Sequence, residues 1–323
     1  MVSEIKRSKK LPKVKLKREP EKKLSLKKAL SKYWSLYIIL AIIMLYYVIF
    51  NYIPIIMGVI ISFKKMRIGS NISRAPWVGL DNYIYVLKDP EIWNVVKNTL
   101  QISVLRLFWG FWPPIVLAIC IFDLMSVRFK KISQTIVYIP YFFSWVIVYG
   151  IVFAFFSGNG LINSFLGILG FEHVDFLMST NAFRPMLIGS QIWKGVGWGT
   201  ILYFAALTNV NPELYEAAKI DGAGPLTRIR VITLPTIMPI ITFSLIMALG
   251  SILNNDFEQI LMFYNPAVYE VADIIDTWVY RVGLGKMQYG IGSAVGLMKA
   301  FISLILIVSA NSISKKTSGR GMW

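Results

Sequence analysis

Long apolar runs, separated by short polar connections, dominate the pattern of the chain. A window of about 19 residues, the length at which a helix crosses the hydrocarbon core of a bilayer, finds six such runs. They cover residues 36–62, 98–122, 134–156, 185–207, 236–254 and 291–310. Each run is continuously apolar, whereas the strands of a membrane barrel alternate between apolar and polar positions. The pattern therefore predicts an all-α polytopic membrane protein with six transmembrane helices.

Two segments outside these runs have helical periodicity but are too short to cross a bilayer. They cover residues 161–170 and 272–282. Short segments with one apolar face are typical of the membrane interface. We expect both to lie at the outer surface of the membrane.

The basic residues are distributed unevenly, and their distribution predicts the orientation. The chain has 34 Lys and Arg residues against 17 Asp and Glu. Residues 1–34 and the connections on the same side of the membrane hold 22 of the 34 basic residues. Connections rich in Lys and Arg stay on the cytoplasmic side. We therefore expect a multi-pass protein of the cell membrane with its N- and C-termini in the cytoplasm.

This pattern divides the chain into three expected parts. They are a basic cytoplasmic arm at residues 1–34, a six-helix membrane domain at 35–314 and a cytoplasmic tail at 315–323. The first apolar run is long enough to span the bilayer, so we expect the arm to be retained rather than removed with a signal peptide. Its expected partner is anionic membrane lipid rather than nucleic acid.

The chain lacks residues that several kinds of enzyme chemistry need. The chain has one cysteine, Cys120, and one histidine, His173, which exclude an internal disulfide and a zinc site of the usual composition. Gly285 and Lys286 form its one Gly-Lys pair, but Tyr280 stands where a phosphate-binding loop needs glycine. We predict no catalytic residue, no metal site and no ATP site, and we expect the chain not to be an enzyme.

The connection at residues 211–235 is patterned as a short helix followed by a tight turn. Its sequence is NPELYEAAKIDGAGPLTRIRVITLP. Asn211 is a favoured N-cap residue, and Pro212 is favoured in the first turn of a helix. Gly222 and Gly224 favour the end of that helix. We predict a short exposed helix on the cytoplasmic side.

This connection resembles the EAA loop of permeases from binding-protein-dependent ABC importers. The resemblance rests on EAA at 216–218, DGAG at 221–224 and ITLP at 232–235. It extends from about residue 36 to the C-terminus, through WVGLDNYIYVLKDPEIW and YGIGSAVGLMKAFISLILIVSANSISKK. Over these segments the chain is similar to the LplB/YteP-type permeases of the maltose-type carbohydrate uptake group. The resemblance implies the six-helix type I ABC permease fold and the import of sugars, oligosaccharides in particular.

The resemblance also implies partners and a coupling site. The partners are a second homologous permease subunit, two copies of a cytoplasmic ABC ATPase, and an extracellular solute-binding protein. ATP and Mg²⁺ would be bound by the ATPase, and no cofactor by this chain. The residues implied to couple the chain to the ATPase are Glu216 as a charge contact, Ala217 and Ala218 as small docking residues, Asp221, and Gly222 as the turn.

Polar and aromatic residues within the runs are candidates for contact with a sugar. Polar groups are costly inside a membrane, and aromatic faces combined with hydrogen-bonding groups suit a sugar ring. The candidates are Arg106, Gln191, Trp193, Lys194, Trp198, Asn255 and Lys299. Gln191, Lys194 and Trp198 share one helical face.

Each candidate also has a structural interpretation. The tryptophans would belong to helix packing or interfacial belts, and Lys194 would pair with a carboxylate. Lys299 would contact the partner permease, and Asn255 would lie at a solvated helix end. Arg106 and Lys194 would suit an acidic oligosaccharide, but a permease for neutral sugars could keep the same residues.

Three other functions remain open from the sequence. The first is the same ABC importer with a solute other than a sugar. The second is an ion-coupled secondary carrier, which would need acidic or histidine relays within spans that hold hardly any acidic residue. The third is a membrane scaffold whose EAA-like loop binds a cytoplasmic partner without transport.

Overall fold

The computed structural model describes residues 31–66, 69 and 71–318. Most of the expected basic arm and the end of the expected tail lie outside these residues. The chain forms two compact units, Met1–Ile56 and Met57–Trp323. The described part is nearly all helical, as predicted, with an isolated β-bridge between Lys64 and Trp77.

The described residues of the first unit form one helical run. It consists of α2 (Trp34–Tyr47), the π-helical segment η1 (Val48–Tyr52) and the start of α3 (Ile53–Ser62). The N–H of Ile53 bonds the carbonyl of Val48, five residues back, next to Pro54, which has no N–H to donate. Together α2, η1 and α3 cover Trp34–Ser62, a stretch of 29 residues, and the first predicted run, 36–62, lies within it.

Four long helices form the frame of the second unit. They are α5 (Pro90–Phe122), α9 (Thr180–Thr208), α12 (Leu234–Gly250) and α16 (Tyr289–Ser318). α5 packs along α9, and α12 packs against α9 and α16. A buried cluster holds α5, α9 and α12 together, with side chains that include Ile115, Ala118, Tyr203, Leu207 and Ile237.

Five helical stretches in the described part are long and apolar enough to cross a membrane. They are Trp34–Ser62, Pro90–Phe122, Trp145–Ile168, Pro225–Gly250 and Tyr289–Ser309. The fourth predicted run, 185–207, lies within α9, which has 29 residues but is not among the five. Polar residues such as Gln191 and Lys194 interrupt its apolar sequence.

The third predicted run, 134–156, is not a single helix. The structure divides it into α6 (Val127–Tyr138), the 3₁₀ turn η2 (Ile139–Phe142) and α7 (Trp145–Phe156). Pro140 has no backbone N–H to continue the helical hydrogen bonds, and the backbone becomes extended at Phe143 and Ser144, with ψ of 139° and 157°. Ser144 then caps α7 by accepting a hydrogen bond from the N–H of Ile147 at 3.4 Å. The sequence prediction was wrong here because the residues on both sides of the break are apolar.

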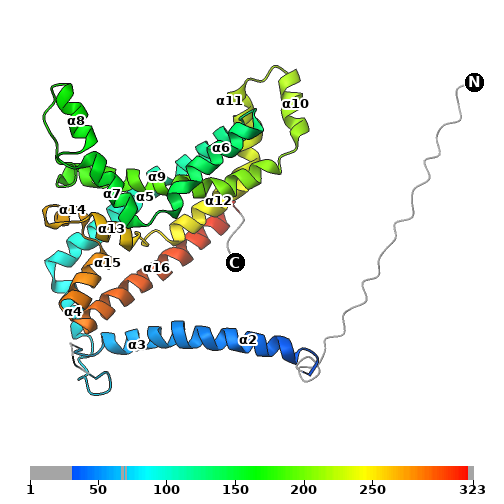
Figure 1. Cartoon of the computed structure of the whole chain (residues 1–323). Helices are drawn as coiled ribbons and strands as arrows, with labels where there is room; N and C mark the ends of the chain where they lie inside the picture. The colour runs from blue at the N-terminus through cyan, green and yellow to red at the C-terminus, as the bar shows by residue number, and fades with distance from the viewer. Residues whose placement is uncertain (1–30, 67–68, 70, 319–323) are drawn as a thin grey trace, which may run out of the picture. The chain divides into compact units, whose positions relative to one another are not determined.

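The shorter helices of the second unit lie at two opposite ends of the long ones (Figure 1). One end holds α8 (Leu161–Ile168), α13 (Phe257–Phe263), α14 (Tyr269–Ala272) and α15 (Ile275–Trp278). The other end holds α10 (Pro212–Ile220) and α11 (Pro225–Arg228). We call these the α13–α15 end and the α10 end. The two segments predicted to be short helices thus lie opposite the predicted coupling connection.

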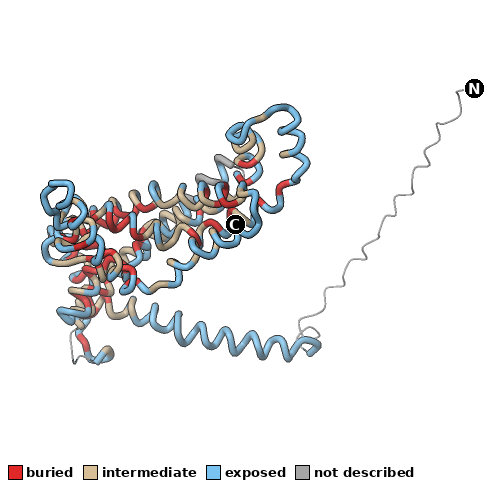
Figure 2. Tube along the Cα trace, turned by 45° about the horizontal axis from the view of Figure 1, so that its top comes forward, coloured by how far each residue is buried: buried red, intermediate tan, exposed pale blue. Residues whose placement is uncertain are grey.

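Burial is concentrated at the α13–α15 end, whereas the loop that carries α10 is largely exposed (Figure 2). Trp145, Phe183, Leu187, Ile260 and Phe263 belong to one buried cluster, contributed by α7, α9 and α13. A well-packed end of this kind supplies most of the apolar burial that keeps a helical unit together.

Ion pairs also stabilise the α13–α15 end. Arg281, in the π-helical segment η5 (Val279–Gly285), contacts Asp273 at 2.6 Å and Glu91 at 2.7 Å. Burial raises the pKa of the Asp273 carboxyl, although the hydrogen bonds from Thr277 and Arg281 oppose the shift. Burial also acts to lower the pKa of Arg281, but its bonds to Asp273 and Glu91 outweigh that effect and raise it.

Candidate functional site

The helix α10 forms where its sequence predicts. Asn211 caps it by accepting a hydrogen bond from the N–H of Glu213 at 3.1 Å, and Pro212 is its first residue. The helix ends at Ile220, and Gly222 has a φ of +76°, a left-handed conformation that glycine adopts without strain. The predicted cap and turn are both confirmed.

The two faces of α10 differ in what they contact. The hydroxyl of Tyr215 shares a hydrogen bond with that of Thr233 at 3.0 Å, and its ring lies 6.3 Å from that of Phe122 at the end of α5. Glu216 and Ala217 are exposed. Among the described residues, none forms an ion pair with Glu216. One face of α10 is therefore attached to the chain, and the other is free for a partner.

The attached face is connected to the long helices. Lys130 of α6 donates to the carbonyl of Phe122 at 2.7 Å, and its ammonium lies 5.1 Å from the Phe122 ring and 6.0 Å from the Phe204 ring. Phe122 in turn contacts Tyr215. A displacement of α10 would thus act on α5, α6 and α9 together.

The exposed part of this loop carries large apolar side chains. Ile220 is 87% exposed and Leu226, in α11, is 81% exposed. Exposed apolar side chains grouped on one surface indicate contact with another protein. The sequence analysis missed Leu226. Its place in the DGAGPL turn, next to a predicted docking helix, was the signal that could have found it.

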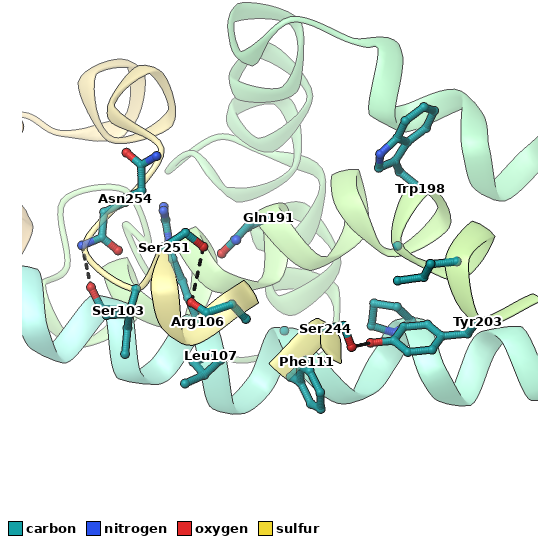
Figure 3. Close-up of a pocket in the computed structure, with 17 residues that line it drawn as sticks. Ser103, Arg106, Leu107, Phe111, Gln191, Trp198, Tyr203, Ser244, Ser251 and Asn254 are labelled. Carbon is teal, nitrogen blue, oxygen red and sulfur yellow. Dashed lines mark hydrogen bonds between the residues drawn. The ribbon is translucent and has the colours of Figure 1, made fainter. Parts of the chain in front are cut away.

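A cavity of about 460 Å³ lies among α5, α9 and α12 (Figure 3). This volume falls within the range of about 300–1,000 Å³ that is usual for small-molecule sites. Its lining includes the predicted residues Arg106, Gln191 and Asn255, together with the polar residues Ser103, Ser251 and Asn254. Trp198 lines the same cavity together with Tyr203 and Ser244.

Arg106 is buried in the wall of this cavity, with 7% of its surface exposed. Its Nη2 donates to the side-chain carbonyl of Gln259 in α13. Gln259 donates in turn to the carbonyl of Leu187 at 2.7 Å and to the hydroxyl of Ser190 at 3.0 Å. Arg106 thereby links α5 to α13 and α9.

A smaller cavity, of about 250 Å³, adjoins the first and shares Gly110, Pro114 and Gln191 with it. Lys194 lines this cavity and donates to the carbonyl of Tyr141 at 3.0 Å. Its ammonium lies 5.1 Å from the Tyr141 ring and 5.2 Å from the Trp145 ring. Within the described chain it therefore makes aromatic contacts and no ion pair, so the expected carboxylate partner is not found.

Asp256 also lines the smaller cavity. Its carboxylate accepts a hydrogen bond from the indole of Trp145 at 3.0 Å. It precedes α13 with a φ of 36°, a left-handed conformation that is uncommon outside glycine.

The remaining candidates have other surroundings. Trp193 points to a separate apolar cavity of about 550 Å³ between α7 and α9. Lys299 contacts Asp276 of α15 at 2.6 Å and lines neither of the two adjoining cavities. Asn255 is 1% exposed and donates to Ser103 at 2.8 Å and to the carbonyl of Thr99 at 3.1 Å. The expectation of a solvated helix end at Asn255 was wrong, because its amide is bound to α5.

The described residues offer no group of side chains that could bind a metal ion. No group of three or more His, Cys, Asp or Glu side chains lies together there. Cys120 is exposed and forms no disulfide. What the chain offers is a docking helix at one end and a polar cavity between its long helices.

Comparison with known proteins assigns the class. Residues 115–319 match the family of binding-protein-dependent transport system inner membrane components. The chain belongs to this family, the permease subunits of ABC importers. Such a subunit is not itself an enzyme, because ATP is hydrolysed by a separate subunit.

Several relatives are similar over nearly the whole chain. It is 39% identical to the polygalacturonan/rhamnogalacturonan transport system permease protein YteP of Bacillus subtilis (strain 168) over 308 residues, which are 95% of either chain. It is 40% identical to protein LplB of the same organism over 289 residues, 89% of this chain and 91% of LplB. The resemblance inferred from the EAA-like loop is confirmed.

A solved structure has the same fold. It is the crystal structure of a bacterial alginate ABC transporter in complex with an alginate pentasaccharide-bound periplasmic protein. One of its chains matches with a TM-score of 0.84 and 38% identity, over 92% of this chain and 99% of that one.

Proposed function

We propose that this chain is the transmembrane subunit of an ATP-driven importer that moves oligosaccharides across the cell membrane. The observation that carries this proposal is the presence of an exposed docking helix, α10, attached to the same helices, α5 and α9, that line the polar cavity. The printed functions of the relatives, transport of polygalacturonan/rhamnogalacturonan and of arabinooligosaccharides, support the choice of cargo.

The proposed complex has four kinds of component besides the cargo and the membrane lipid. This chain pairs with a second homologous permease, and the pair binds two copies of a cytoplasmic ATPase that holds ATP and Mg²⁺. An extracellular solute-binding protein delivers the sugar. The similar alginate transporter, whose structure includes a sugar-loaded periplasmic protein, supports this last component.

The proposed orientation places the α10 end and both termini in the cytoplasm. The excess of basic residues on that side supports it. The single native cysteine makes the orientation testable, because Cys120→Ser leaves a background into which one cysteine can be introduced at a time. We expect a cysteine at residue 219 to react with a membrane-impermeant reagent only after the cells are opened, and one at residue 172 to react in intact cells.

The proposed coupling site consists of Glu216, Ala217, Ala218, Asp221 and Gly222. Glu216 and Ala217 lie on the exposed face of α10, whereas Ala218 is half-buried. Binding of ATP draws the two ATPase subunits together in this mechanism, and α10 transmits that movement to the long helices through Tyr215 and Phe122.

The test is the ATPase activity of the whole complex in lipid, purified through this subunit. We expect an ATPase to co-purify and its activity to rise when the binding protein carries an oligosaccharide. A complex without ATPase would contradict the proposal and favour the scaffold. Stimulation by a loaded protein carrying a non-sugar solute, with none for any oligosaccharide, would change the cargo and keep the mechanism.

A further inference from the structure

The two adjoining cavities hold an excess of positive charge. Among the described residues that line them, the charged ones are Arg106 in the larger cavity and Lys194 and Asp256 in the smaller. Asp256 attracts Arg106 over some distance but forms no ion pair with it, and its carboxylate accepts the Trp145 indole. The two cavities therefore hold two cations and one carboxylate, which is already hydrogen-bonded to Trp145.

The hydrogen-bonding capacity of Arg106 is incompletely used. A guanidinium has five N–H donors, and one of its nitrogens donates to Gln259. The Nε atom of Arg106 is buried and has no hydrogen-bond partner in the described structure. The same holds for Oε1 of Gln191, which lines the cavity from α9. Both residues line the cavity, so a ligand there can supply the missing partners of these costly buried groups, unlike the unpartnered Nε of Arg281 and Nε1 of Trp278, which line neither cavity.

The larger cavity has a polar part and an aromatic part. Figure 3 shows Arg106, Gln191, Ser251 and Asn254 on one side, and Trp198 and Tyr203 on the other. One face of Trp198 is stacked on Tyr141, with ring centroids 4.4 Å apart and an interplanar angle of 6°. Stacking holds the indole in a fixed orientation beside the cavity.

We propose that Arg106 selects sugars that carry carboxylates, with Lys194 providing a second positive charge in the adjoining cavity. This inference rests on the proposed function and names the chemical class of its cargo. The planar guanidinium fork matches a carboxylate better than it matches a neutral hydroxyl, because two parallel N–H groups meet two oxygens. A sugar hydroxyl donates to Oε1 of Gln191, and the apolar face of the ring lies toward the aromatic part.

Position within the fold agrees with this role. Arg106 is bonded to Gln259 of α13 and so lies toward the α13–α15 end of the cavity. In the proposed orientation this is the side from which the binding protein delivers its sugar. A carboxylated sugar thus meets the guanidinium as it enters and the aromatic part afterwards.

The competing explanation is that Arg106 is only a brace between α5, α9 and α13. Its bond to Gln259 fits that explanation, but a brace accounts for neither the lack of an ion-pair partner nor the unpartnered Oε1 of Gln191 in the same cavity. A brace would also affect every cargo equally. The selection of one cargo over another separates the two explanations.

The experiment measures uptake by the whole complex in proteoliposomes. The probes are trigalacturonate and trimannuronate, each compared with the trisaccharide obtained by reducing its carboxyl groups to alcohols. The variants are Arg106→Gln, Arg106→Lys and the control Arg184→Gln. The substitution Arg184→Gln likewise removes one positive charge, in this case from α9. Arg184 bonds Asn98 and the carbonyl of Val271 and does not line the cavity.

We expect Arg106→Gln to lower uptake of the carboxylated probe at least tenfold relative to the wild type, and uptake of the reduced probe less than twofold. Arg106→Lys is expected to retain an intermediate rate, and Arg184→Gln to leave the ratio of the two rates unchanged. If the wild type imports only carboxylated probes, the advantage of Arg106→Lys over Arg106→Gln is the deciding result.

Several outcomes would overturn the inference while the proposed function stands. They are equal losses for both probes in Arg106→Gln, no loss for either, and a wild type that imports only the reduced probes. Equal rates for Arg106→Lys and Arg106→Gln in a complex that imports only acidic probes would also overturn it. A wild type with no ATP-driven uptake of any of the four probes would overturn the proposed function, and the inference with it.

Discussion

The two ends of the second unit are built in opposite ways. At the α13–α15 end, Arg281 pairs with Asp273 and Glu91, and Thr277 donates to Asp273. At the α10 end, Glu216 has no ion-pair partner in the described structure, and Ile220 and Leu226 are almost fully exposed. The first end pairs its charged side chains within the chain, whereas Glu216 and the large apolar side chains of the second end are exposed. Substitutions at the first end should therefore cost stability, and at the second they should cost coupling.

The largest effect is expected at the α10 end. Glu216→Lys should abolish sugar-stimulated uptake, a loss of more than tenfold, because it reverses the charge on the free face of α10. Uptake into proteoliposomes and the amount of chain in the membrane are the measurements. Glu213→Gln is the control, since it keeps the oxygen that contacts Asn211. Uptake at the wild-type rate in Glu216→Lys would contradict the assignment.

At the α13–α15 end, Arg281→Ala should lower the free energy of unfolding by about 2 kcal/mol, because it leaves the buried Asp273 carboxylate without its cation. Thermal unfolding of the purified complex measures this. Glu91→Gln is expected to cost less than about 1 kcal/mol, since Glu91 is the exposed partner of the pair. Equal losses of unfolding free energy in Arg281→Ala and Glu91→Gln would show that the burial of Asp273 does not determine the cost of breaking the ion pair.

A smaller effect is expected from the apolar part of the α10 end. Leu226→Ser should weaken stimulation of the ATPase by roughly threefold without changing the unfolding temperature, because an exposed side chain contributes to docking and not to the core. The control is Val231→Ser, a second exposed apolar residue that lies beyond α11 in the same connection. A fall in unfolding temperature for Leu226→Ser alone would mean that Leu226 packs within the chain.

The smallest effect concerns pH. The pKa of Asp273 is raised from its ordinary value of 3.8, so the folded state binds its proton more tightly than the unfolded state does. Stability therefore falls as pH rises from about 3.8 through the raised pKa, and the full penalty is present above it. The difference in unfolding temperature between the wild type and Asp273→Asn across this window is the measurement. A difference that does not change with pH would contradict the raised pKa.

The sequence predicted the local features well. The cap at Asn211, the turn at Gly222 and the short helices within 161–170 and 272–282 depend on neighbouring residues and were found, whereas α13 was not predicted. The division of the run 134–156 into α6, η2 and α7 was not predicted, because a hydropathy window records how apolar a stretch is and not whether its backbone bonds are complete.

The candidate site depended on contacts between distant parts of the chain. Arg106 was singled out because a cation in an apolar run is costly, but its bond to Gln259 joins residues 153 positions apart. The bond of Asn255 to Thr99 spans 156 positions. No periodicity reports such pairs, so Asn255 was expected in solvent and the carboxylate of Lys299, Asp276, was not foreseen.

The break between α6 and α7 has an electrostatic consequence. Trp145, the first residue of α7, lines the smaller cavity, so the start of a new helix lies at its wall. The first N–H groups of a helix have no partner within it, and the aligned peptide dipoles give that terminus a partial positive charge of about half an elementary unit. One unbroken helix through this region would have its terminus elsewhere. The interruption at Pro140 therefore adds backbone charge of the same sign as Lys194 to the place where we propose that an anionic sugar passes.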